Sequence, residues 1–156
     1  MSEYRWALFF HLVGVALLAG GMAVAGVGLG AAWRRERPSE VALLLGTTRA
    51  GVLLVALGSV FVLVCGFWLI EVTGHGLDEG WLVGSLGLFV VGAVLGAIGG
   101  RRPKQARLLA ERLAREGDQP SAELSERVRD RVALALNAAS ALALTAVLLL
   151  MIWQPR

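Results

Sequence analysis

Four long apolar stretches separated by three polar connections dominate the pattern of hydrophobic and polar positions along the chain. They cover residues 6–33, 50–70, 81–100 and 132–153, and none of them contains a formally charged side chain. Each supplies the roughly 20 apolar residues that an α-helix needs to cross a bilayer. The pattern therefore predicts an all-α polytopic membrane protein, a four-transmembrane-helix bundle that forms a single transmembrane domain.

The composition favours lipid as the main solvent of the chain. Of its 156 residues 56% are hydrophobic, and the mean hydropathy is +0.67, which leaves too little polar surface for a soluble globule of this size. The single cysteine, Cys65, excludes an intramolecular disulfide and a thiolate zinc site. The net charge is +3, but the basic residues flank the apolar stretches. We therefore expect no nucleic-acid partner.

The Lys and Arg residues are distributed unevenly over the three connections. Residues 34–40 and 101–131 hold three and nine of them, twelve of the fifteen in the chain, whereas residues 71–80 contain acidic side chains and no Lys or Arg. The positive-inside rule places the two basic connections in the cytoplasm and both termini outside. Nearly all the cations are Arg, a bias typical of GC-rich bacterial genomes, so we expect the bacterial cytoplasmic (inner) membrane.

The connection 101–131 is predicted to form a cytoplasmic helical hairpin. Its first half has apolar residues at helical spacing against charged ones, which indicates an amphipathic helix over 103–116 at the inner leaflet. These apolar residues are Ala106, Leu109, Ala110 and Leu113. A second helix is predicted to begin near Ser121 and to run straight into the fourth span. Two interpretations are open: a solvated hairpin that only fixes topology, or a docking site for anionic lipid or a cytoplasmic partner.

Small residues at regular spacing predict close helix packing within the spans. Three series carry this pattern, namely Gly26 and Gly30, then Gly51, Gly58 and Cys65, and finally Gly92, Gly96 and Gly100. The second series has a seven-residue period, which keeps small residues on one seam of a left-handed helix crossing. We expect these seams to pack the monomer, while a homodimer through one of them is the alternative.

His11 is the most informative single residue, because it lies about 7 Å below Trp6 at the outer end of the first span. An ionisable group at that depth needs a partner, and the candidates are Glu71 at the outer end of the second span, or the backbone and His75 of the outer connection. Three interpretations compete. His11 is a neutral tether between helices, or a ligand of haem b together with His75 or Met22, or a group that handles protons or metal ions with the outer carboxylates.

A second polar pair is predicted at the inner boundary, where Arg49 lies next to the second span and Asn137 about one turn into the fourth. A hydrogen bond between them would join these two helices, and Arg49 would otherwise extend its guanidinium to the headgroups. A binding role for the pair is the further alternative. We find no catalytic set and no phosphate-binding loop, so an enzymatic role is not expected.

Several short motifs spread over nearly the whole chain are shared with a known family. They comprise His11 in FFHLVG, the Gly20-Gly21 pair, Arg49 opening the second span, Gly66 with Trp68, Trp81 opening the third span, and the Arg-rich connection. With these motifs the chain resembles a bacterial family of predicted four-helix integral membrane proteins of unknown function.

That family is similar in layout to copper-resistance D proteins and to four-helix haem-binding protoporphyrinogen oxidases. In those groups a first-span histidine is associated with haem, so the resemblance implies a haem ligand at His11. They tend to have Trp just before the glycine pair, where this chain has Leu18 and Ala19.

Three functions follow from these expectations. The first is a non-enzymatic four-helix scaffold or accessory subunit, the second a b-type haem-binding redox protein that uses His11, and the third an ion or small-solute carrier that depends on Glu71 or His75.

Overall fold

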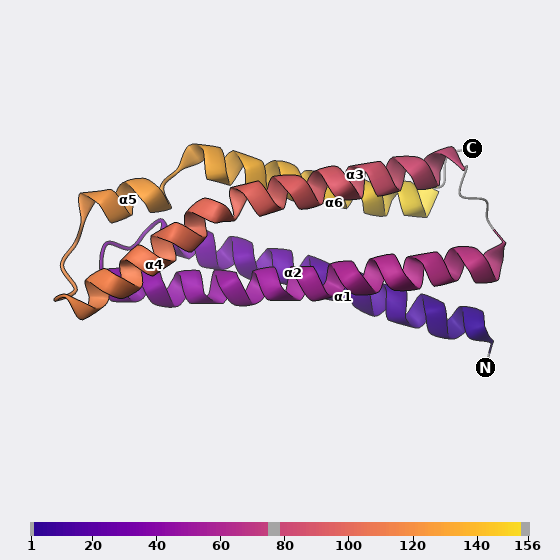
Figure 1. Ribbon diagram of the computed structural model, residues 1–156, viewed down its shortest axis with the longest axis horizontal. Helices are drawn as coiled ribbons and strands as arrows, with labels where there is room; N and C mark the ends of the chain where they lie inside the picture. Colours follow the sequence, from indigo (N-terminus) through magenta and orange to yellow (C-terminus); the bar gives the residue numbers. More distant parts are fainter. Residues whose placement is uncertain (1, 75–78, 154–156) are drawn as a thin grey trace. The chain divides into compact units, whose positions relative to one another are not determined.

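The computed structural model describes residues 2–74 and 79–153, and every regular element within them is an α-helix. The helices are α1 (Glu3–Ala32), α2 (Pro38–Thr73), α3 (Gly80–Gly99), α4 (Arg101–Arg115), α5 (Ala122–Val128) and α6 (Arg131–Trp153), as labelled in Figure 1. The four apolar helices are long enough to cross a membrane. The prediction of an all-α protein with four such helices is therefore confirmed.

The chain divides into two compact units, which are described separately. The first unit contains α1 as far as Gly28 and α2 from Thr47 onward. The second unit contains the segment Leu29–Gly46, which includes the end of α1 and the beginning of α2, together with α3, α4, α5 and α6.

In the first unit, α1 and α2 run antiparallel and pack through glycines. A Cβ atom built on Gly51 would lie 2.5 Å from the backbone nitrogen of Ala25, and one on Gly58 would lie 2.6 Å from that of Leu18. The two backbones can approach so closely only because these positions lack a side chain. The seam predicted from the seven-residue spacing of Gly51 and Gly58 is thus confirmed. By contrast, a Cβ on Gly26 would meet no atom within 4 Å.

In the second unit, α3 and α6 lie side by side, as Figure 1 shows, and small residues of α3 face α6. The hydroxyl of Ser140 donates a 2.7 Å hydrogen bond to the buried backbone oxygen of Gly92. One turn further along α3, a Cβ on Gly96 would lie 2.9 Å from the Ser140 Oγ. A bond of this kind is favourable in a lipid environment, where water cannot compete for the hydroxyl.

The polar part of the second unit has a hydrophobic core of its own. We call this part of the unit the polar platform and define it as the segment Leu29–Gly46 together with α4, α5 and the turn between them. The buried core residues are Ala32, Val41, Leu45, Ala106, Leu109, Ala110, Leu124 and Val128. The amphipathic helix predicted over 103–116 is present as α4, but its apolar face packs against the ends of α1 and α2. The hairpin is therefore part of a folded core and does not stand alone in solvent.

Two helix boundaries differ from the prediction for physical reasons. The second span was predicted to begin at residue 50, but helix α2 begins at Pro38. Its additional N-terminal turns form because Val41 and Leu45, which precede Arg49, are buried in the platform core. The continuous helix predicted from Ser121 into the fourth span is wrong. It is broken between α5 and α6, where the side chain of Asp130 accepts hydrogen bonds from the first turn of α6.

Candidate functional site

His11 lies in the α1–α2 seam and is 8% exposed. Its Nδ1 atom is 3.1 Å from the backbone oxygen of Val62 on α2. A carbonyl oxygen can only accept a hydrogen bond, so Nδ1 carries the hydrogen, and in a neutral ring the lone pair is then on Nε2. His11 therefore ties α1 to α2, as the tether interpretation predicts, and its second nitrogen remains a potential ligand.

The space for the imidazole ring comes from Gly66, one helical turn beyond Val62. A Cβ at this position would lie 3.4 Å from Cε1 of His11 and 3.5 Å from its Nδ1, which is ordinary van der Waals contact. A methyl group would therefore fit there beside the ring. Gly66 is thus part of the His11 site.

The other predicted partners of His11 are not gathered around it. Glu71 is exposed on α2 and follows Gly66, which lies beside the ring, by five residues, roughly 7.5 Å along the helix axis. Met22 follows His11 on α1 by eleven residues, roughly 16 Å, so the two cannot bind one iron ion. His75 lies outside the described residues. Among the residues that the structure describes, no group of three or more His, Cys, Asp or Glu side chains could hold a metal ion.

The predicted inner pair belongs to two different units. Arg49 lies on an exposed position of α2 in the first unit. Asn137 lies in the second unit, where its amide nitrogen donates a 2.8 Å hydrogen bond to the Ala133 oxygen and packs against Gly99. The hydrogen bond between Arg49 and Asn137 stays a prediction.

Ser39 and Asp118, 79 residues apart in sequence, join the two connections within the polar platform. The backbone N–H of Ser39 donates a 2.7 Å hydrogen bond to one carboxylate oxygen of Asp118, and the hydroxyl of Ser39 donates a 2.7 Å hydrogen bond to the other. Asp118 follows Gly117 in the turn after α4, and both have positive φ. The hydroxyl of Ser39, and then its N–H, stabilise the carboxylate and lower the pKa of Asp118. Sequence analysis did not identify this contact.

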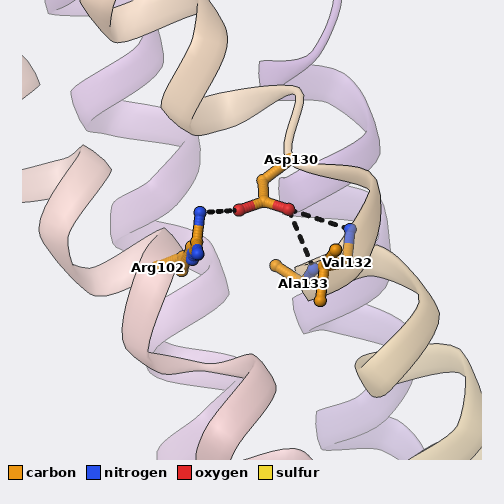
Figure 2. A network of polar contacts seen from close by, with 4 residues as sticks. All are labelled: Arg102, Asp130, Val132 and Ala133. Carbon is orange, nitrogen blue, oxygen red and sulfur yellow. Dashed lines mark hydrogen bonds and ion pairs between the residues drawn. The ribbon is translucent and has the colours of Figure 1, made fainter.

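A second clip joins the start of α4 to the start of α6, as Figure 2 shows. One oxygen of Asp130 accepts hydrogen bonds from the backbone N–H groups of Val132, at 2.8 Å, and Ala133, at 3.2 Å. The other oxygen accepts a hydrogen bond from Arg102. An aspartate directly before an apolar run is a typical helix-capping signal, so this role could have been recognised in the sequence.

The exposed face of α4, opposite its buried apolar face, carries a shallow hollow of about 290 Å³. It is lined by Leu108, Glu111, Arg112, Arg115 and Glu116. Leu108 is 50% exposed, so an apolar side chain lies among charged residues of both signs.

Four apolar helices of membrane-spanning length and a folded polar platform define a polytopic helical membrane protein. Residues 6–155 match the family described as "Predicted integral membrane protein (DUF2269)", and the chain belongs to this family. The family membership predicted from the motifs is confirmed. No curated protein and no solved structure matches the chain. The likeness to copper-resistance D proteins and protoporphyrinogen oxidases stays a prediction.

Proposed function

We propose that the protein is a non-enzymatic scaffold of the bacterial inner membrane, with both termini outside and the polar platform in the cytoplasm as a docking surface for another protein. The observation that carries this proposal is the buried core of the platform, in which the ends of α1 and α2 that flank the first connection pack against α4 and α5 of the third. Connections that only fixed the topology would need no such core. Because the core orders α4, the hollow around Leu108 has a defined shape.

The docking role is tested by site-specific photocrosslinking in cells. A photoreactive residue at Leu108 should give a discrete adduct with one protein. The same residue at Leu142, which is 72% exposed on the apolar helix α6, serves as the matched control and should react with lipid alone. The change Leu109→Asp places a charge in the platform core and should abolish the adduct at Leu108. Equal labelling at Leu108 and Leu142 would contradict the proposed docking surface.

The proposed orientation is supported by the charge difference between the connections and has a separate test. Reporter fusions at Gly117 should be active only as cytoplasmic reporters, and fusions at Gly74 only as extracytoplasmic ones. The reverse result would refute the orientation and leave the platform itself unaffected.

A second candidate function is haem binding, favoured by the geometry of His11. The bond from Nδ1 to the Val62 oxygen fixes the ring and leaves Nε2 with its lone pair, an arrangement that metal-ligating histidines use. Absorbance of the purified protein separates the two functions. A stoichiometric Soret band that is lost in His11→Ala but retained in Met22→Leu would show that His11 binds haem and would refute a scaffold-only role. A colourless protein from haem-supplemented cells would exclude the haem candidate.

A further inference from the structure

Positive charge is concentrated where the polar platform meets the apolar helices α3 and α6. Residues 101–104 and 129–131, which we call the collar, contain five cationic side chains and one carboxylate, a formal charge of +4. The rest of this connection, residues 105–128, has four cationic and five acidic side chains, a formal charge of −1. The excess positive charge of the whole connection therefore belongs to the collar.

The clip between Arg102 and Asp130 brings the two segments of the collar together (Figure 2). Arg101 is the chain neighbour of one partner, and Arg129 and Arg131 flank the other. Asp130 is engaged by Arg102 and by two backbone N–H groups, so the collar's only carboxylate is already satisfied. In the middle of the connection three arginines form ion pairs with glutamates four residues away: Arg107 with Glu111, Arg112 with Glu116, and Arg127 with Glu123.

Four cations of the collar, Arg101, Lys104, Arg129 and Arg131, are exposed. They lie where the apolar helices meet the platform, because α3 ends at Gly99 and α6 begins at Arg131. Directly beyond them along the two helices the surface is apolar and open. Ile98 of α3 is 44% exposed and Val132 of α6 is 62% exposed.

We propose that the collar binds the headgroup of an anionic phospholipid. The guanidinium groups provide paired donors to phosphate oxygens, while acyl chains cover the exposed apolar residues beside the collar. Charge and apolar surface in this order fit an amphiphile and not a free anion. The lipid site needs neither the proposed protein partner nor the proposed orientation, since it requires only that α3 and α6 lie in a bilayer.

The test uses the full-length protein, purified in a neutral detergent and freed of lipid. Thermal unfolding and native mass spectrometry are measured with phosphatidylglycerol, with phosphatidylcholine of the same chains, and with glycerol 3-phosphate. We expect phosphatidylglycerol to raise the unfolding temperature and to remain bound, and we expect 0.5 M salt to weaken this effect because the cations are exposed. Equal effects of the two phospholipids would overturn the proposal, and so would glycerol 3-phosphate acting as well as the phospholipid.

Matched double variants locate the site. R129Q/R131Q leaves the clip in place and should weaken phosphatidylglycerol binding roughly fivefold for each charge removed, about 25-fold in total. R112Q/R115Q removes two exposed cations of the same connection outside the collar and should change the affinity less than twofold. A control variant that loses as much affinity as the collar variant would show a general charge effect and refute the site.

Discussion

The neighbouring glycines Gly20 and Gly21 should respond in opposite ways to the same substitution. A Cβ on Gly21 would lie 2.7 Å from both the Gly51 oxygen and the Val55 nitrogen, whereas a Cβ on Gly20 would meet no atom within 4 Å. Ordinary contacts begin near 3.5 Å, so Gly21→Ala must push α1 and α2 apart by about 0.8 Å. Overpacking of this kind costs about 1–3 kcal/mol.

Both substitutions gain the same helix propensity, up to about 1 kcal/mol, so the difference between the variants isolates the packing cost. We expect Gly20→Ala to unfold at or above the wild-type temperature. Gly21→Ala should unfold at a lower temperature than Gly20→Ala, by roughly 2–4 °C for each kcal/mol. The assay is thermal unfolding followed by circular dichroism in one detergent. Equal unfolding temperatures for the two variants would refute the seam.

Three further changes test contacts within the second unit. Ser140→Ala removes the buried bond to Gly92 and should destabilise the protein by about 1 kcal/mol in detergent denaturation; an unchanged midpoint would contradict this contact. Hydrogen bonds from Ser39 lower the pKa of Asp118 in the folded protein. The ionised carboxylate therefore stabilises the fold above the pKa of an aspartate in the unfolded chain, about 4, and this stabilisation is lost as the pH falls further. The Ser39 amide resonance should move with this titration, and Asp118→Asn should abolish the movement. Asp130→Ala should speed hydrogen exchange at the first turn of α6, and unaltered exchange there would argue against the cap.

The apolar helices and their packing faces were predictable from the sequence because they depend on the residues within each helix. Each apolar stretch is long enough to form a spanning helix, and the seven-residue spacing of Gly51 and Gly58 identified the seam. The amphipathic pattern around Leu109 also identified the buried face of α4. Periodicity shows which face of a helix is apolar but not what covers it, so the packing of α4 on the ends of α1 and α2 could not be foreseen.

The candidate site was predictable only in part. The depth of His11 showed that it needs a partner, but the partner is a backbone oxygen, and every residue offers one. The sequence therefore suggested Glu71, His75 or the backbone of the outer connection, and not the Val62 oxygen within α2. The contact between Ser39 and Asp118 links positions 79 residues apart, and neither residue has a distinctive local pattern. Such pairs depend on the tertiary arrangement.

The shared core of the polar platform constrains how the chain can be inserted. Because Val41, near the start of α2, and Leu109 of α4 are buried together, the first and third connections must lie on the same side of the bilayer. Inverting α1 alone, or the pair α3 and α6 alone, would expose this core to water. The core also contains Leu124 and Val128 of α5, so it is complete only after α5 has been synthesised, and its closure then fixes both connections on one side.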